Sequence, residues 1–311
     1  MKIVVTGGAG FIGANLCRLL DAQAFVEHVV ALDDLSTGLR QNLIGAPGVE
    51  LREGSILNAD DLDGVMKGTQ AVIHLAARPS VPRSLADPMA THQVNATGTM
   101  MVLEAARRHG LPHVIVASSS SVYGANPALP KREDLATRPL SPYAASKLAS
   151  EAYALSYGSS FGLPVLAFRF FNVFGPLQPA GHAYAAVVPA FVSCALTGQA
   201  LPVHGDGTQT RDFTFVGTVV AVLVDALRRR VTDPAPVNLA YGSRVSLLEL
   251  IEVLEDVVGH PLERDHLATR AGDVPHSQAD QTRLTRLFPE VRPTPLAEGL
   301  RATVAWFRET R

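Results

Sequence analysis

Three glycines near the amino terminus place the strongest constraint on the fold. The segment 3-IVVTGGAGFIG-13 sets Gly7, Gly10 and Gly13 between an apolar strand and the start of a helix. Glycines at this spacing allow a tight turn whose backbone N–H groups approach a pyrophosphate closely, and the positive end of the helix faces the phosphate charge. The segment predicts a dinucleotide-binding unit, although three glycines could also form a simple packing turn.

Short β-rich runs alternate with longer helical patterns over the first half of the chain. The runs lack the polar alternation of a half-exposed strand, which indicates burial on both faces. We therefore expect an α/β fold with a Rossmann-type, doubly wound parallel sheet. The runs lie at 3–6, 29–33, 49–52, 71–76, 113–118 and 165–171.

The composition of the chain changes after residue 172, where Pro and Gly become frequent and predicted strands become sparse. We expect a dinucleotide-binding domain over 1–171 and a smaller, mainly separate mixed α/β lobe over 172–311. The run 237-VNLAYG-242 predicts a return to the sheet within the region 217–242.

The overall charge is nearly balanced, with 27 Lys+Arg against 29 Asp+Glu. This balance disfavours nucleic acid or an anionic membrane as the main partner and favours a small molecule. Cys17 and Cys194 give no metal spacing and no disulfide framework, so we expect no metal and a cytoplasmic location. No apolar run approaches the roughly 20 residues that cross a bilayer, and the apolar start is too short for a signal peptide.

A carboxylate follows the second predicted strand. Asp33 lies twenty residues after Gly13, where it can accept hydrogen bonds from both adenosine ribose hydroxyls and repel a 2′-phosphate. This position favours NAD over NADP, although an aspartate at a strand end can also simply start a turn. His74, in 74-HLAA-77, is expected to be an interior structural histidine near the same site.

A tyrosine and a lysine share one face of a later predicted helix. In 141-SPYAASKLASE-151, Tyr143 and Lys147 are four residues apart, after a proline that helps to start the helix. A nearby ammonium stabilises a phenolate, so Tyr143 is a candidate base. The spacing alone is common by chance and gains weight from the dinucleotide turn that precedes it.

In combination these motifs resemble one family. The segments TGGAGFIG, SSSSVYG, YAASK and FRFFNVFGP, in this order, are similar to those of the extended short-chain dehydrogenase/reductases, specifically the NAD-dependent nucleotide-sugar epimerases and dehydratases. The resemblance implies a Rossmann domain with NAD and a second lobe with a nucleoside-diphosphate sugar, and it implies a homodimer through helices 88–109 and 142–161. It implies cofactor contacts from Tyr143, Lys147, Phe11, Ile12, Asp34, Ser36, Thr37, Gly38, Ser55, Ile56, Leu75, Ala76, Ala77, Asn95 and Ser118.

The serine run bears on the reaction. Ser119 matches the family residue that hydrogen-bonds the reacting sugar oxygen, four positions before Tyr123, and Ser118 is expected to line the cofactor side. Members that eliminate water carry acidic residues at the next two positions, where this chain has Ser120 and Ser121. Serine has no useful pKa for that work. The resemblance therefore implies 4-epimerisation through a transient 4-keto sugar, with Ser119, Tyr143 and Lys147 as catalytic residues.

Substrate contacts also follow from the resemblance. Asn172 matches a residue that contacts the sugar diphosphate, although it could also be only a turn former. Arg211 and Arg270 match arginines that clamp the diphosphate, and Asp273 matches the aspartate that holds the uridine ribose; each arginine could instead form a surface ion pair. Further implied substrate contacts are Ser80, Ser119, Ser120, Tyr143, Val187, Val203, His204 and Ser277.

The sugar itself is ranked on three features. The segments 80-SVPRSLADP-88 and 183-AYAAVVPAF-191, with His276 and Ser277, look most like the UDP-N-acetylglucosamine 4-epimerases. A small residue at 277 leaves room for an acetamido group. No Arg or Lys occurs in 174–184 to offset the desolvation of a uronate carboxylate. We rank UDP-hexoses and UDP-N-acetylhexosamines above UDP-glucuronate.

Other readings stay open at this point. A uronate epimerase, a decarboxylase or a 4-keto reductase would fit the same fold. A non-catalytic NAD-sensing regulator is an alternative of another class, but it would not need Ser119, Tyr143 and Lys147 together. The chain departs from common family residues at Ser55, which follows Gly54 where many relatives have an acid near the adenine, and at Leu177 and Thr218.

Overall fold

A computed structural model describes residues 1–180, 186–269 and 274–310. Its centre is a seven-stranded sheet of order β11-β6-β5-β4-β1-β2-β3, in which every neighbouring pair is parallel. The predicted doubly wound α/β fold is therefore confirmed. The strands are β1 Lys2–Thr6, β2 His28–Asp33, β3 Val49–Glu53, β4 Ala71–His74, β5 His113–Ser119, β6 Val165–Phe170 and β11 Val237–Leu239.

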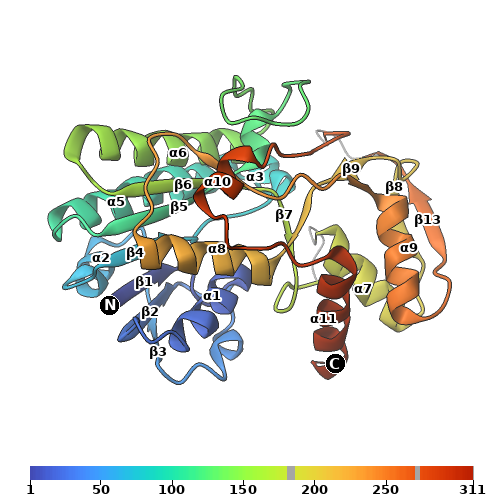
Figure 1. The fold of residues 1–311 in the computed structure, drawn as a ribbon, viewed down its shortest axis with the longest axis horizontal. Coiled ribbons are helices and arrows are strands. Elements are labelled where there is room, and N and C mark those ends of the chain that lie inside the picture. Colours follow the sequence, from blue (N-terminus) through green and yellow to red (C-terminus); the bar gives the residue numbers. More distant parts are fainter. Residues whose placement is uncertain (181–185, 270–273, 311) are drawn as a thin grey trace.

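Helices cover both faces of the sheet (Figure 1). Alternate residues of β1 point to opposite cores: Ile3 and Val5 pack with α1 and α8, whereas Val4 packs with α2, α5 and α6. Burial on both faces explains why these strands are uniformly apolar. The covering helices are α1 Phe11–Asp21 and α8 Val216–Arg229 on one face, and α2 Ala59–Met66, α5 Gly98–Arg108 and α6 Pro142–Phe161 on the other.

The helix expected over 88–109 is interrupted. It consists of α4 Pro88–His92, one π-helical turn at Gln93–Thr97 and α5, and it follows the short helix α3 Val81–Ala86. The π turn contains Asn95, whose side chain binds groups outside its own helix: Oδ1 accepts from the Arg78 N–H at 2.7 Å and Nδ2 donates to Ser146 Oγ at 2.9 Å. Single π turns of this kind are frequent at functional sites.

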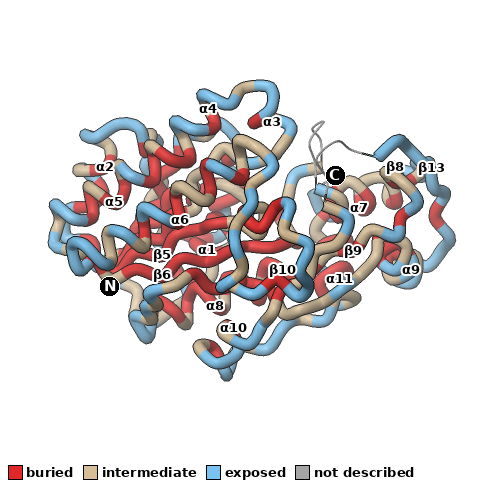
Figure 2. Tube along the Cα trace, turned by 90° about the horizontal axis from the view of Figure 1, so that it is seen from above, coloured by how far each residue is buried: buried red, intermediate tan, exposed pale blue. Residues whose placement is uncertain are grey.

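The second half of the chain forms a smaller lobe beside the sheet (Figures 1 and 2). Its core is apolar and includes Phe174, Phe191, Ile251 and Phe307. The pairs β10–β7 and β13–β8 are parallel, and β12–β9 is antiparallel. The elements are β7 Asn172–Phe174, α7 Val187–Thr197, β8 Leu201–His204, β9 Thr210–Arg211, β10 Phe213–Phe215, β12 Val245–Ser246, α9 Leu247–Val258, β13 Arg264–Leu267 and α11 Leu296–Glu309. The short helix α10 Thr282–Leu287 instead packs against β11 and the core of the main sheet.

Two further observations concern the described part of the chain. Cys17 is buried, Cys194 is partly buried, and neither forms a disulfide. Within the described ranges, no helix combines the length and apolar character needed to cross a bilayer.

Candidate active site

The predicted site residues of the first domain lie at the carboxyl edge of the sheet. In open α/β sheets this edge binds ligands, above all where the strand order reverses, which here is between β1 and β4. Gly7 adopts φ +70, and a Cβ there would lie 2.7 Å from the Ala76 nitrogen. A Cβ on Gly13 would lie 2.1 Å from the Gly7 carbonyl oxygen. Glycine is therefore required at position 7, in the turn, and at position 13, in the first turn of α1.

The turn also suits a dinucleotide. Gly10 is the N-cap residue of α1, and no side chain caps this helix among the described residues. The first-turn N–H groups, which include those of Phe11 and Ile12, are therefore open toward a phosphate, and the helix dipole favours negative charge there.

Asp33, at the end of β2, fixes the glycine turn from the other side. Its Oδ2 accepts from the Ala9 N–H and its Oδ1 from the Leu35 N–H, both at 2.9 Å. Burial raises the pKa of this carboxyl group, and the backbone hydrogen bonds oppose that shift. The hydrogen bond from Leu35 means that Asp33 also starts a local turn, which is the alternative role given for it in the sequence analysis. The loop that follows contains Asp34, Ser36, Thr37 and Gly38, and Gly38 lies directly against the Asp33 carboxylate.

The remaining predicted cofactor residues follow the neighbouring strands. Leu75, Ala76 and Ala77 come directly after β4, and the Ala76 N–H lies 3.3 Å from Thr6 Oγ1. Ser55 and Ile56 come after β3, where the Asp61 carboxylate accepts from the Ser55 N–H. These positions border the same edge of the sheet as the glycine turn.

His74 is buried, as predicted, and links strands to helices. Its Nδ1 lies 2.7 Å from Thr6 Oγ1 and its Nε2 2.9 Å from Thr99 Oγ1. Burial lowers the pKa of His74 to about 3, helped by the nearby charge of Lys147. The imidazole is therefore neutral and structural.

Helix α6 brings Tyr143 and Lys147 to the end of β5. The Ser141 hydroxyl caps the helix by accepting from the Ala144 N–H at 3.1 Å. Burial raises the pKa of Tyr143, and the nearby Ser119 side chain opposes this rise. Burial also lowers the pKa of Lys147 to about 8. Tyr143 and Lys147 thus share one face of α6 near the end of β5, and burial shifts the pKa of both.

The serine run is ordered residue by residue. Ser119 Oγ accepts from the Ser121 N–H at 3.2 Å and lies 2.9 Å from Ser121 Oγ. Ser118 points the other way: its hydroxyl donates to Glu151 Oε2 at 2.7 Å, and 2% of the residue is exposed. The Ser118 hydroxyl therefore belongs to a buried network, which limits its expected role toward the cofactor to its backbone.

A cavity of about 290 Å³ extends from Ser119 toward the second lobe. It brings together Ser119, Ser120, Asn172, Arg211 and Ser277, five of the residues predicted to face substrate. The full lining is Val81, Ser119, Ser120, Ser121, Tyr123, Gly124, Lys131, Leu140, Ser141, Ala144, Phe171, Asn172, Arg211, Val274, His276 and Ser277.

Several predicted substrate residues are placed differently. Val203 is fully buried in the lobe core, backbone included, and does not line the cavity. His204 Nδ1 bonds the Ala268 carbonyl at 2.9 Å, and Val187 starts α7. Ser80 precedes the cavity residue Val81 and has φ 96, a conformation in which non-glycine residues are strained. Arg270 and Asp273 lie outside the described residues.

The structure adds residues that the sequence analysis missed. Asp212 is fully buried next to Arg211 and accepts hydrogen bonds from the Gly242 N–H, the Ala279 N–H and the Ser243 hydroxyl at 2.8 to 3.0 Å. It ties the lobe segments around Ser277 to β9. In the sequence, the one indication of a role for Asp212 is its position directly after Arg211, a predicted substrate residue. Its hydrogen-bond partners are distant in sequence and could not be predicted.

Comparison with known proteins decides the family. The model of the "NAD dependent epimerase/dehydratase family" matches residues 3–240. The chain belongs to this family. A UDP-glucose 4-epimerase from Mycolicibacterium smegmatis is 38% identical over 99% of both chains.

Solved structures of family members have the same fold. A UDP-N-acetylglucosamine 4-epimerase from Methanobrevibacter ruminantium, in complex with UDP-N-acetylmuramic acid, superposes with a TM-score of 0.94 at 35% identity, covering 100% of this chain and 99% of that one. A UDP-glucuronic acid 4-epimerase from Bacillus cereus, solved with UDP-glucuronic acid and NAD, gives 0.90 at 30% identity, with both chains fully covered. The Rossmann-type fold and the NAD-dependent class of this epimerase/dehydratase family member are thereby established.

Proposed function

We propose that this family member is a 4-epimerase of a UDP-sugar. The observation that carries the proposal is the place of Ser119: its side chain lowers the pKa of Tyr143, and it lines a cavity that reaches Arg211, next to the helix that also carries the buried Lys147. No acidic residue stands at positions 120 and 121, so the elimination of water lacks an acid and a base.

The proposed reaction starts with proton transfer. Tyr143 takes the proton of the sugar 4-hydroxyl, and Ser119 holds the sugar oxygen while its charge changes. NAD, when bound, supplies the acceptor and later the donor of the hydride. The 4-keto sugar turns in the cavity, and Tyr143 returns the proton after the opposite face has been reduced. Lys147 favours the phenolate form of Tyr143 and would contact the nicotinamide ribose.

Cofactor and substrate would meet where the two lobes face each other. The α1 amino terminus, the glycine turn and Asp33 would hold NAD, and the polar cavity would hold the sugar diphosphate, with Arg211 as a planar donor to phosphate oxygens. We place the domain boundary near residue 172, with α8 and β11 returning to the sheet. UDP-glucose/UDP-galactose and UDP-GlcNAc/UDP-GalNAc are the proposed substrate pairs, as relatives with these activities suggest.

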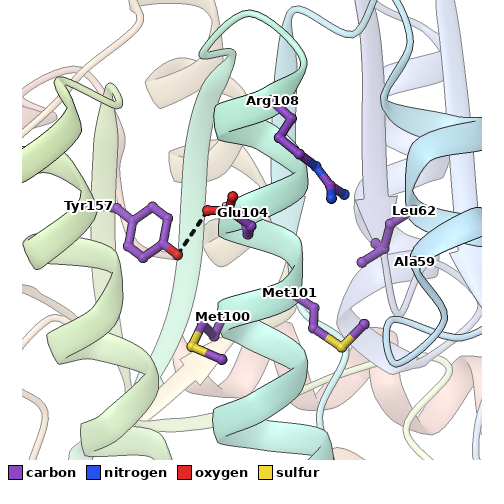
Figure 3. A pocket seen from close by; sticks show the side chains of 7 residues that line it. All are labelled: Ala59, Leu62, Met100, Met101, Glu104, Arg108 and Tyr157. Carbon is purple, nitrogen blue, oxygen red and sulfur yellow. Dashed lines mark hydrogen bonds between the residues drawn. The ribbon is translucent and has the colours of Figure 1, made fainter.

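We also propose a homodimer through α5 and α6. These helices expose apolar side chains on their outer side: Met100 is 37% exposed, Tyr153 41% and Phe161 49%. A hollow between α2, α5 and α6 contains Met100, Met101 and Tyr157 (Figure 3). A second copy would cover this surface in a two-fold, self-complementary contact.

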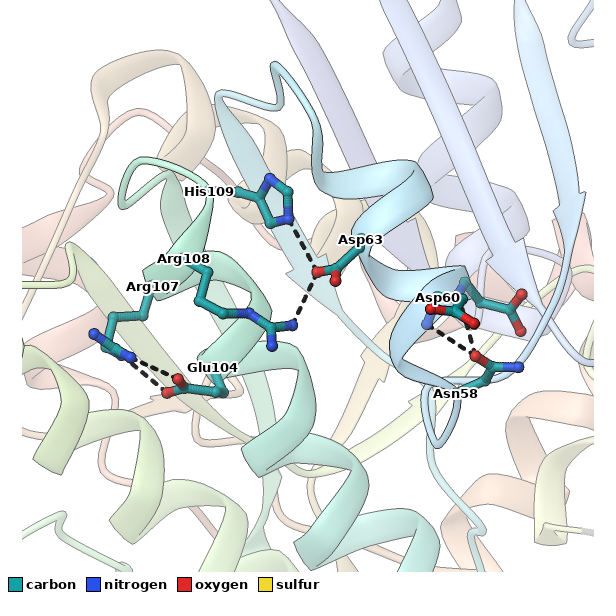
Figure 4. Close-up of polar contacts among 8 residues, drawn as sticks. Asn58, Asp60, Asp63, Glu104, Arg107, Arg108 and His109 are labelled. Atoms are coloured by element: carbon teal, nitrogen blue, oxygen red, sulfur yellow. Dashed lines mark hydrogen bonds and ion pairs between the residues drawn. The ribbon is translucent and has the colours of Figure 1, made fainter.

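Charged pairs border the same surface. Glu104 binds Arg107, and Asp63 binds both Arg108 and His109 at 2.9 Å (Figure 4). Such pairs suit the polar rim of an interface.

Light scattering of Tyr153→Glu against the wild type tests the dimer: the variant is expected to be monomeric, and an unchanged mass would contradict the proposal.

The reaction is tested with purified protein and no added cofactor. UDP-glucose and UDP-N-acetylglucosamine are incubated separately, and the C4 epimer of each is sought by NMR. We expect an epimer from at least one sugar and its loss in Tyr143→Phe. Near-normal turnover by Tyr143→Phe with NAD content unchanged would overturn the assignment.

A further inference from the structure

Lys131 lines the proposed sugar cavity although it belongs to neither predicted substrate segment. It lies in the loop between Tyr123 and α6, and 4% of it is exposed. Its backbone is held at both ends: its N–H donates to the Gln278 carbonyl at 2.7 Å, and its carbonyl accepts from the Asp280 N–H at 2.9 Å and from Asn238 Nδ2 at 2.7 Å. The backbone position from which this side chain extends is therefore fixed.

Lys131 links two segments of the cavity wall, one through its backbone and the other through its ammonium. Gln278 directly follows Ser277, and the Lys131 ammonium donates to the Asn126 carbonyl. The Asn126 N–H in turn bonds the Tyr123 carbonyl, in the turn that continues from the serine run. Lys131 thus runs from the segment after Ser277 to the turn after Ser121, along the wall between the two segments proposed to contact the hexose.

The ammonium is incompletely partnered. It carries three N–H donors, and among the described residues only the Asn126 carbonyl receives a hydrogen bond from it. The acids that follow it in sequence have other partners: Glu133 Oε1 accepts from the Asn238 N–H at 3.0 Å, and Asp134 pairs with Arg132 at 2.7 Å. An ammonium buried without a counter-charge is costly, and burial lowers the pKa of Lys131. A ligand carboxylate would remove this cost.

We propose that Lys131 is a substrate-binding residue whose ammonium pairs with a carboxylate carried by the hexose, so that the cavity accepts a UDP-uronate besides neutral UDP-sugars. The proposal rests on the UDP-sugar function proposed above and refines its substrate class. The sequence argument against a uronate considered only the stretch 174–184, whereas this cation comes from the loop after β5.

The test compares two ligands that differ only at C6. Calorimetry of the NAD-loaded protein measures the Kd of UDP-glucose and of UDP-glucuronate for the wild type, Lys131→Met, Lys131→Arg and Arg132→Met. The matched control Arg132 is the next residue, with a side chain that is 63% exposed. We expect Lys131→Met to weaken UDP-glucuronate about tenfold or more and UDP-glucose less than about twofold, because a charge-assisted hydrogen bond is lost only for the carboxylate. Lys131→Arg and Arg132→Met should keep the wild-type preference.

Equal losses for both ligands, or wild-type UDP-glucuronate binding more than about tenfold weaker than UDP-glucose binding, would overturn the role of Lys131. If Lys131→Met is destabilised, Lys131→Arg still decides, since it keeps the charge. Every Kd is measured with the added substitution Tyr143→Phe, so that the proposed reaction does not convert the ligand during the titration, and turnover of the wild type is assayed separately. Binding of both ligands in these titrations, without epimerisation of either by the wild type, would therefore refute the proposed reaction and leave the binding role of Lys131 intact.

Discussion

Arg169 of β6 donates two hydrogen bonds to the carboxylate of Glu151 on α6, Nε to Oε2 at 2.9 Å and Nη2 to Oε1 at 2.7 Å. Both side chains are 4% exposed. Ser118 of β5 donates to the same carboxylate, and the guanidinium lies over the Tyr123 ring, 4.7 Å from its centroid. This buried group joins two central strands to the helix that carries Tyr143 and Lys147.

Breaking this pair should be costly. Glu151→Gln leaves the buried Arg169 charge without its counter-ion, and we expect it to lower the free energy of unfolding by about 3–5 kcal/mol. Urea denaturation measures the change. Asp134→Asn, which breaks the exposed pair with Arg132, is the control and should leave the midpoint unchanged. A loss below about 1 kcal/mol for Glu151→Gln would show that the pair does not stabilise the fold.

His74 should make the protein acid-sensitive. Its folded pKa is lowered from 6.5 to about 3, so the unfolded chain binds more protons between these values. The contribution of His74 to stability is therefore complete above pH 6.5 and is lost as the pH falls toward 3. At pH 5 the loss should be about 2 kcal/mol.

Urea denaturation at pH 7 and pH 5 tests this dependence. His74→Gln should remove most of the difference between the two pH values, whereas His266→Gln, at an exposed position of β13, should keep the wild-type difference. An identical pH dependence in His74→Gln and the wild type would place the acid sensitivity elsewhere.

The features that the sequence predicted well are local ones. Gly7 and Gly10 lie in the turn before α1 and Gly13 in the first turn of that helix, while Tyr143 and Lys147 lie within about one helical turn, so local spacing determines their geometry. The sheet was predictable because burial on both faces leaves uniformly apolar strands.

The features that escaped prediction depend on contacts between distant segments. Asp212 meets Ser243 and Ala279, and the Lys131 backbone meets Gln278, at separations that no local pattern records. Ser118 differs from Ser119 only in the direction of its side chain, because successive residues of β5 face opposite sides of the sheet. The π turn at Gln93–Thr97 left the apolar pattern of the helix intact and so was not visible in it.

The buried charge of Lys147 should lower the stability of the protein, although the lysine is needed for the proposed reaction. Its pKa is lowered from 10.5 to about 8 by burial, so the cost of holding its charge is complete below pH 8 and vanishes as the pH rises toward 10.5. We expect Lys147→Met to stabilise the cofactor-free protein by up to ~3 kcal/mol at pH 7, with the gain shrinking above pH 8, while epimerisation is lost.

Thermal or urea unfolding of cofactor-free protein at pH 7 and pH 9.5 measures this effect. Lys67→Met removes an exposed lysine and serves as the control, for which no stabilisation is expected. A Lys147→Met variant that is less stable than the wild type at pH 7 would mean that contacts of the lysine outweigh the cost of its burial.

Ser277 should decide how large a sugar the cavity accepts. Its side chain lines the cavity, and its position is fixed because its N–H donates to the Thr210 carbonyl at 3.1 Å. Ser277→Tyr would place a ring where an acetamido group could lie, so we expect kcat/KM for UDP-N-acetylglucosamine to fall about tenfold more than that for UDP-glucose. Ser277→Ala changes the polarity without adding bulk and should keep the wild-type ratio. Coupled assays of both sugars give the ratio directly, and an equal loss for the two sugars in Ser277→Tyr would mean that another residue sets the size limit.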